Sequence, residues 1–225
     1  MIRPVEKVLF AWSSGKDSAL ALYEIKRTQQ YEISSLLTTT TDEYDRISMH
    51  GVRTTLLEQQ AQSLGLPLEK VSISKNVTDE EYQSRMATTL ANFRDNGVSS
   101  VVYGDIFLEG VRKYREEQLS KVGMRGLFPL WGRNSANLSK TLIDLGFKAI
   151  VTCVDSRVID SSFVGRLIDE SFLAEIPSSV DPNGENGEFH SFVFEGPIFR
   201  ESIPYIKGEV VKRDSFYFCD LLPGS

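Results

Sequence analysis

The sequence contains little cysteine, and its spacing indicates neither a metal site nor a disulfide framework. The two cysteines among the 225 residues, Cys153 and Cys219, lie in unrelated contexts, so no Cys-x-x-Cys motif or zinc ligand set can be built from them. The N-terminal segment lacks the apolar core of a signal peptide, and no stretch reaches the length of a membrane span. These absences predict reduced thiols, a cytoplasmic protein and no membrane partner.

Basic residues are also in deficit. The chain has 25 Lys and Arg against 31 Asp and Glu, and its formal net charge is -6. This balance argues against a broad nucleic-acid surface, although it leaves a local basic groove open. No internal repeat, low-complexity run or Pro/Ser-rich linker is visible. Because 41% of the residues are hydrophobic, we expect a globular protein whose parts pack tightly together.

The most informative stretch lies between an apolar run at 8–12 and the helical pattern that follows it. Its sequence is Ser13-Ser14-Gly15-Lys16-Asp17-Ser18. A turn of small residues between a buried strand and a helix collects free backbone N–H groups and the positive end of the helix dipole, which favour phosphate. Lys16 adds positive charge, and two serines add hydroxyl donors. Asp17 is repelled by phosphate unless a cation lies between them, so the stretch predicts a magnesium–nucleotide complex.

Two common phosphate loops do not match this stretch. The Walker A loop needs an earlier glycine and a Ser or Thr directly after the lysine, and the dinucleotide pattern G-x-G-x-x-G is absent. The plainer alternative is an ordinary polar turn in which Ser13 or Ser14 is the N-cap of the helix. Residue type, order and context favour the nucleotide site.

The first half of the chain alternates between strand and helix patterns. We predict strands at 8–12, 33–40, 68–73 and 98–103, and helices at 18–28, 51–64, 79–93 and 109–122. Repeated β-α units predict a parallel sheet with ligands at the carboxyl ends of its strands. Three polar segments follow strands in this way, namely the loop at 13–18, the segment at 38–53, and Gly104-Asp105.

The pattern changes after residue 125, where we place a boundary between a domain at 1–125 and a smaller one at 126–225. We expect helices at 136–145 and around Val164, Leu167, Ile168 and Phe172 in the second part. Strands are expected at 149–154, 190–194, 208–211 and 216–219. The predicted fold is therefore α/β, with an N-terminal parallel-sheet domain and a C-terminal α+β domain.

A second dense cluster spans residues 181–190 and reads Asp-Pro-Asn-Gly-Glu-Asn-Gly-Glu-Phe-His. Its glycines and proline predict a loop that presents Glu185, Glu188 and His190 just before a strand. Carboxylates this close raise each other's pKa unless a cation neutralises them, so the cluster is suited to hold magnesium, bind a cationic group or accept a proton from an amine. The alternative is a solvated acidic turn.

The 13–18 stretch resembles the pyrophosphate-binding loop S-G-G-K-D-S of the ATP pyrophosphatase superfamily. Ser14 stands where the first glycine of that pattern usually lies. We therefore expect Gly15 alone to supply the flexible turn, and Ser14 to adopt a backbone conformation outside the left-handed region.

Nearly the whole chain resembles the diphthine–ammonia ligase family. The shared motifs are the 13–18 loop, Met49-His50-Gly51-Val52-Arg53, Tyr103-Gly104-Asp105-Ile106-Phe107, Tyr114-Arg115, Leu127-Phe128-Pro129-Leu130-Trp131-Gly132 and the complete string at 184–190. Asn183 is a departure, because many members carry cysteine there. The variant at 12–15 is similar to a subgroup that is widespread in bacteria, which do not make diphthamide, so the acceptor substrate stays open.

The resemblance implies a Rossmann-like nucleotide α-hydrolase fold and an amide-forming reaction that uses ATP and Mg²⁺. A substrate carboxylate would be adenylated with release of pyrophosphate, and ammonia would then displace AMP. The implied catalytic residues are Lys16, Asp17, Glu188 and His190. ATP binding is implied for Ser13, Ser14, Gly15, Lys16, Asp17, Ser18, Thr38, Thr39, Gly104 and Asp105, and metal binding for Asp17 and Asp105. Substrate binding is implied for His50, Arg53, Arg115, Glu185, Asn186 and Glu188.

Two other functions stay open from the sequence. One is a non-catalytic sensor that binds ATP or AMP. The other is an ATP pyrophosphatase that acts on a different acceptor, such as a tRNA or a small metabolite, although tRNA thiolation usually needs reactive cysteines or a basic face that this chain lacks. The sequence also leaves a homodimer open.

Overall fold

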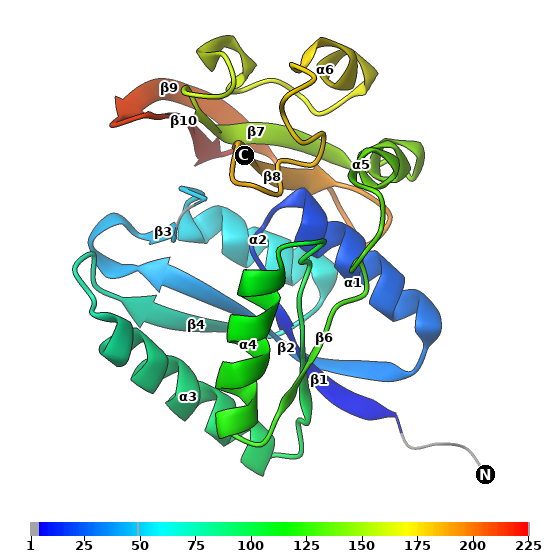
Figure 1. Ribbon diagram of the computed structural model, residues 1–225, viewed down its shortest axis with the longest axis vertical. Helices are drawn as coiled ribbons and strands as arrows, with labels where there is room; N and C mark the ends of the chain where they lie inside the picture. Colours follow the sequence, from blue (N-terminus) through cyan, green and yellow to red (C-terminus); the bar gives the residue numbers. More distant parts are fainter. Residues whose placement is uncertain (1–4, 49, 225) are drawn as a thin grey trace.

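The first sheet of the protein places the 13–18 loop at the carboxyl end of a central strand (Figure 1). The computed structural model describes residues 5–48 and 50–224, so Met49 of the quoted motif lies outside the described residues. Strand β1 (Glu6–Ala11) pairs in parallel with β2 (Tyr31–Thr41) on one side and β5 (Ser100–Val102) on the other. β2 also pairs in parallel with β4 (Leu68–Ile73). The predicted parallel sheet is confirmed.

Helices cover both faces of this sheet because successive residues of β1 point to opposite sides. Phe10 belongs to a core cluster with residues of α1 (Lys16–Thr28) and α2 (Thr54–Leu64). Leu9 belongs to a second cluster with residues of α3 (Asp79–Asp95) and α4 (Glu109–Lys121). Val8, Leu9 and Phe10 are each 0% exposed, which explains why this strand reads as a continuous apolar run.

The second sheet is antiparallel and follows the order β8-β7-β10-β9. Its strands are β7 (Lys148–Asp155), β8 (Phe189–Glu195), β9 (Tyr205–Arg213) and β10 (Phe216–Pro223). In Figure 1, α6 (Glu170–Glu175) lies above this sheet, α5 (Ser135–Asp144) lies beside it, and α1 and α2 lie between the two sheets. The first core cluster runs from α1 through to β7 and β8, so the two halves share one apolar interior. The α/β fold class with a C-terminal α+β part is confirmed.

Two predicted helices differ from the structure. The helix expected around residues 164–172 is restricted to α6, because Gly165 has φ +76°, Leu167 forms a β-bridge with Ile150, and the Asp169 carboxylate caps the helix by accepting from Phe172 N at 2.8 Å. The helix expected from residue 51 begins at Thr54, since the backbone before it turns at Gly51.

Short elements were not predicted. β6 (Arg125–Leu127) extends the first sheet beside β5, and β3 (Arg46–Ile47) pairs antiparallel with the end of β2. The 3-10 turns η1 (Asp42–Tyr44) and η2 (Ser161–Phe163) are equally brief. Strands of two or three residues carry too little periodicity to be recognised. The division at residue 125 stays a prediction, and β6 runs across it.

Within residues 5–48 and 50–224, no helix combines the length and apolar character required to cross a membrane.

Candidate active site

A cavity of about 600 Å³ lies where β1, β2 and β5 end. Four segments supply most of its lining: the loop after β1, the end of β2 with the turn that follows, the loop after β5, and residues 184–191 at the start of β8. Ile73, Tyr82 and Arg115 complete it. The two motifs that lie far apart in the sequence thus face the same space. The predicted site residues that line it are Ser13, Gly15, Lys16, Asp17, Ser18, Thr38, Thr39, His50, Gly104, Asp105, Arg115, Glu185 and His190.

The 13–18 loop, called the phosphate loop here after its predicted ligand, turns at Ser14, which has φ +67°. Gly15 is the N-cap of α1 with φ -91° and ψ 174°, so neither serine is the cap, and the expectation that Gly15 alone would provide the turn was wrong. The left-handed conformation aims the Ser14 carbonyl away from the cavity, where it accepts from Val193 N at 2.9 Å and Gln60 Nε2 at 3.2 Å. Docking of β8 therefore sets the backbone of Ser14, which itself does not line the cavity.

Replacing Ser14 by glycine is expected to raise the free energy of unfolding by about 1 kcal/mol, because a non-glycine residue in the left-handed region costs roughly that much. The Ser14 hydroxyl is buried without a hydrogen-bond partner among the described residues, so its removal sacrifices no bond. Urea denaturation measures the change. Gln29→Gly, at an exposed left-handed position with φ 53°, is the matched substitution and should also stabilise. An unchanged or lower stability of Ser14→Gly would contradict this account of the turn.

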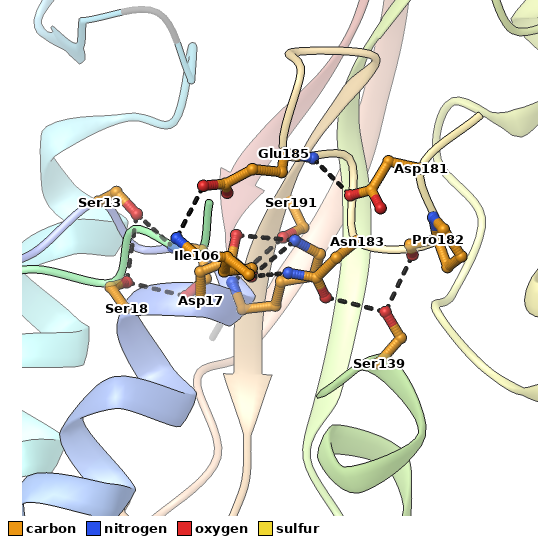
Figure 2. Close-up of polar contacts among 12 residues, drawn as sticks. Ser13, Asp17, Ser18, Ile106, Ser139, Asp181, Pro182, Asn183, Glu185 and Ser191 are labelled. Atoms are coloured by element: carbon orange, nitrogen blue, oxygen red, sulfur yellow. Dashed lines mark hydrogen bonds and ion pairs between the residues drawn. The ribbon is translucent and has the colours of Figure 1, made fainter. Parts of the chain in front are cut away.

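Hydroxyl groups hold the loop in shape. Ser18 Oγ donates to Gly15 O at 2.8 Å, and Ser13 Oγ donates to Ser18 Oγ at 3.2 Å (Figure 2). Lys16 N donates to Ser191 Oγ at 3.2 Å, so β8 also contacts the first turn of α1. The first turn of α1, with Lys16, Asp17 and Ser18, lines the cavity, so the positive end of the helix dipole lies beside it and favours an anion there.

Lys16 is a buried cation at this end of the cavity. The residue is 3% exposed, and its Nζ lies 2.7 Å from Asp17 Oδ2 and 2.9 Å from Asp17 Oδ1. The same ammonium lies 5.4 Å from the centre of the Phe189 ring. A buried ammonium beside a helix N-terminus is a strong attractor for the oxygens of a polyphosphate.

Asp105 and Arg115 form an ion pair in the lining of the cavity. Arg115 Nε lies 2.7 Å from Asp105 Oδ2, and Nη2 donates to Oδ1 at 3.2 Å. The guanidinium also stacks on Tyr103 at 4.3 Å from the ring centre. Burial raises the pKa of Asp105, the charge of Asp17 raises it further, and Arg115 opposes both. The two carboxylates therefore lie close enough to interact across the cavity.

Carboxylate and phosphate oxygens together suit Mg²⁺, which usually keeps several waters and takes only one or two protein carboxylates. Asp17 and Asp105 fit such a role, because their mutual repulsion would be relieved by a cation between them. Among the described residues, no group of three or more His, Cys, Asp or Glu side chains is placed to hold a metal without other ligands.

Glu185 connects the loop at 181–190, called the far loop here, to the loop after β5. Its Oε1 accepts from Ile106 N at 2.8 Å and from Phe107 N at 3.4 Å (Figure 2). Burial raises its pKa from the ordinary value of 4.5 to about 7, with Asp17 adding to the rise, while the backbone donors and Lys16 oppose it. The carboxyl is thus placed to change its charge near neutral pH.

This shift predicts a pH-dependent stability that Glu185→Gln removes. Between pH 4.5 and about 7 the folded chain retains a proton that the unfolded chain releases, so the free energy of unfolding falls as the pH rises through this range. One such proton changes it by at most about 1.4 kcal/mol per pH unit. Glutamine keeps the acceptor oxygen and cannot titrate, so its profile should be flatter when urea denaturation is measured from pH 4.5 to 8. Parallel profiles for Glu185→Gln and the unaltered chain would contradict this, and exposed Glu209→Gln is the control.

Two neutral imidazoles meet at the same end of the cavity as the far loop. The ring centres of His50 and His190 are 4.5 Å apart. Burial lowers the pKa of His190 to about 4 and that of His50 well below its ordinary value, and the positive charge of Lys16 contributes to both. Neutral imidazoles near pH 7 are acceptors of protons and of hydrogen bonds.

The structure does not bring every predicted residue to the cavity. Glu188 is 7% exposed and braces its own loop, since its Oε1 accepts from Asp181 N at 3.1 Å and its Oε2 accepts from Asn186 N at 3.0 Å. Asn186 Nδ2 also donates to Glu188 Oε1 at 2.9 Å. The acidic cluster is therefore a hydrogen-bonded loop in which Glu185, and not Glu188 or Asn186, lines the cavity.

Arg53 also lies away from the cavity. Its Nη2 is 2.7 Å from Asp220 Oδ2 on β10, and Arg46 Nη1 is 2.8 Å from Asp220 Oδ1. Hydrogen bonds from Arg53, followed by those from Arg46, lower the pKa of Asp220 to about 2. The cluster ties β10 to the segment that carries His50, so it supports the cavity from outside.

Some residues of the site were not predicted. Ser191 contacts the first turn of α1, and Gln60, which is 0% exposed, donates to Val193 O at 2.6 Å and accepts from Trp12 Nε1 at 2.9 Å. Asn183 contacts Asp17. Only Asn183 carried a signal, as a departure from the motif. A buried glutamine on a helix is not recognisable from periodicity, because its partners come from distant segments.

Comparisons with known proteins match two family models to successive parts of the chain. A family model described as the diphthamide synthase N-terminal domain matches residues 6–126, and the model for the C-terminal domain matches residues 134–221. A diphthine–ammonia ligase of Schizosaccharomyces pombe is 25% identical over 236 residues, covering 96% of this chain and 38% of the relative. One from Bos taurus is 23% identical over 192 residues, covering 79% of this chain and 72% of the relative. The chain thus spans well under half the length of the yeast relative.

A solved structure with a similar course of the backbone is described as a predicted subunit of tRNA methyltransferase from Methanocaldococcus jannaschii. It is 18% identical, with a TM-score of 0.45, and the match covers 64% of this chain and 77% of that one.

Proposed function

The chain belongs to the diphthamide synthase family, and from this premise we propose that it is an ATP-dependent ligase that forms an amide from a carboxylate acceptor and ammonia. The names of its relatives, diphthine–ammonia ligases, support a C–N ligase. The observation that carries the proposal is that the phosphate loop and the Glu185–His190 loop line one cavity of about 600 Å³. A ligase of this kind needs a nucleotide site and an acceptor site in direct contact.

In the first half-reaction an oxygen of the acceptor carboxylate attacks the α-phosphorus of ATP, and the bond to pyrophosphate breaks. The main barrier is the approach of an anion to a polyanion. Lys16 and the N-terminus of α1 reduce this repulsion, because both lie in the lining of the cavity where the phosphates would bind. Mg²⁺, when bound at Asp17 and Asp105, would shield the phosphate oxygens.

The remaining residues of the first half-reaction surround the nucleoside. The end of β2 supplies Thr38 and Thr39 for the adenosine part, and Thr38 is held by a hydrogen bond from its Oγ1 to Trp12 O at 2.6 Å. Gly104 allows the loop after β5 to approach the phosphate loop closely.

In the second half-reaction the nitrogen of ammonia attacks the acyl carbon of the adenylate, and the bond to AMP breaks. The new amide nitrogen must lose a proton. His190 lines the cavity with His50 beside it, so its position makes it the proposed acceptor of this proton. Burial lowers its pKa to about 4, so it is a weak base near pH 7. Glu185 lies on the same side and, when ionised, favours binding of an ammonium ion or of a cationic acceptor.

ATP–pyrophosphate exchange with Mg²⁺ tests the first half-reaction. We expect exchange that depends on a carboxylate acceptor, for which a protein bearing diphthine is the first choice and small carboxylates are the second. Addition of ammonium should then yield AMP and amide in equal amounts. Tight binding of ATP without pyrophosphate release under any of these conditions would overturn the ligase and leave the sensor.

A further inference from the structure

Asn183 joins the far loop to the phosphate loop, across 166 positions of sequence. Its Nδ2 donates to Asp17 Oδ1, and its Oδ1 accepts from Ser139 Oγ on α5 at 2.8 Å (Figure 2). The residue is 3% exposed, and Ser139 is 0% exposed. Both ends of the amide are therefore used in a buried chain of contacts that runs from α5 through Asn183 and Asp17 to Lys16.

We propose that Asn183 is a positioning residue that holds Asp17 in place at the phosphate end of the cavity and so lowers the cost of freeing Lys16 for phosphate. This inference rests on the proposed function, in which Lys16 meets the phosphates of ATP. Asn183 itself does not line the cavity, so it acts through Asp17 and not on the substrate.

The physical reason is that Asp17 changes its hydrogen-bond partners when a polyphosphate binds. In the structure Asp17 accepts from the Lys16 ammonium through both oxygens, at 2.7 and 2.9 Å. A polyphosphate competes for the same ammonium, and a partly buried carboxylate that loses its cation pays a desolvation cost. The amide of Asn183 donates to Asp17 whether or not Lys16 turns toward phosphate. It thereby lowers the cost of releasing Lys16 and keeps Asp17 aimed into the cavity, where a metal ion would take over.

The orientation of the amide follows from Asp17. An ionised carboxylate only accepts hydrogen bonds, so the NH₂ group faces Asp17 and Oδ1 faces the Ser139 hydroxyl, which can donate to it. Aspartate at this position would present an acceptor and a like charge. A thiol is a weak donor, so the cysteine that many members of the family carry would not replace this contact. The role is specific to asparagine at position 183.

Hydrogen bonds hold the loop around Asn183 to α5 on one side and to the loop after β5 on the other. Ser139 Oγ also contacts Pro182 O at 3.0 Å, and Glu185 N donates to Asp181 Oδ2 at 2.9 Å. Glu185 in turn accepts from Ile106 N. The loop is therefore held with the Asn183 amide facing Asp17 (Figure 2).

The first test compares Asn183→Asp, Asn183→Ala and Ser139→Ala in ATP–pyrophosphate exchange, with kcat and KM for Mg·ATP measured separately. Asn183→Asp keeps the shape and the bond from Ser139, so it isolates the donor. We expect kcat to fall about 10- to 100-fold in Asn183→Asp, as for other groups that orient a ligand's neighbours, with a smaller loss in Ser139→Ala. Asn137 is exposed on α5, the helix that carries Ser139, and Asn137→Asp should leave kcat and KM unchanged. Thermal unfolding monitors the fold of each variant.

The second test is a double-mutant cycle on the Kd of Mg·ATP, measured by calorimetry without turnover. If Asn183 acts through Asp17, Asn183→Ala weakens binding in the unaltered chain and has no effect in an Asp17→Ala background. Equal effects in both backgrounds, or a lower melting temperature of Asn183→Asp with unchanged kcat and KM, would overturn the proposal. If the unaltered chain binds Mg·ATP but never releases pyrophosphate, the ligase fails while the binding cycle still decides the role of Asn183.

Discussion

Lys16→Met is expected to lower the rate of pyrophosphate release by about 100- to 1000-fold, the usual consequence of removing one fixed group that stabilises developing charge. Lys16 is the buried cation beside the N-terminus of α1, and its loss leaves the helix dipole alone to meet the phosphates. Methionine preserves most of the aliphatic stem of this buried side chain, so the fold should persist. The measurement is single-turnover release of pyrophosphate from Mg·ATP in the presence of acceptor.

Lys140→Met is the matched control, because Lys140 is exposed on α5 and does not line the cavity. It should match the unaltered chain in rate. Unchanged pyrophosphate release in folded Lys16→Met would remove the phosphate loop from the mechanism, and with it the assignment of the nucleotide to this end of the cavity.

Gly104→Ala is expected to impair both stability and turnover. A Cβ atom at Gly104 would lie 2.9 Å from the Asp17 carbonyl carbon and 3.0 Å from Ser18 N, and backbone atoms cannot move aside as a flexible side chain would. Overpacking of this kind costs about 1–3 kcal/mol in the free energy of unfolding. It also displaces the loop after β5 from the phosphate loop, and a misplacement of about 1 Å can lower turnover roughly 100-fold. Urea denaturation and the exchange assay measure the two effects.

The same substitution at Gly110 provides the control. A Cβ there meets no atom within 4 Å, and the residue lies in the first turn of α4, so alanine should be neutral or slightly stabilising. If Gly104→Ala is as active as Gly110→Ala, close approach of the two loops is not required for function.

The strand–loop–helix unit at the start of the chain could be predicted because its signals are local. Residues 8–10 are buried on both faces, and a helix of apolar period follows the short polar stretch directly, although the sequence did not identify Gly15 as the N-cap. The far loop was recognisable for the same reason, through its glycines and carboxylates within ten positions.

The sequence did not show which residues of these motifs line the cavity and which support the loops. Glu185 and Glu188 are both acidic residues of one loop, yet Glu185 lines the cavity while Glu188 braces the loop. Arg53 was predicted to bind substrate, but its guanidinium pairs with Asp220 on β10 instead. Such outcomes depend on which distant donor lies beside each carboxylate and which distant acceptor lies beside each guanidinium, and packing decides this.

The sequence by itself determined the α/β fold class, the position of the phosphate loop between β1 and α1, and the loop of carboxylates before β8, since each depends on residues near in sequence. Tertiary structure alone decided that both loops share one cavity, that Ser14 adopts the left-handed conformation, and that Asn183 contacts Asp17. The physical reason is the shared apolar core, which presses β8 against α1 and so joins polar groups that no local pattern connects.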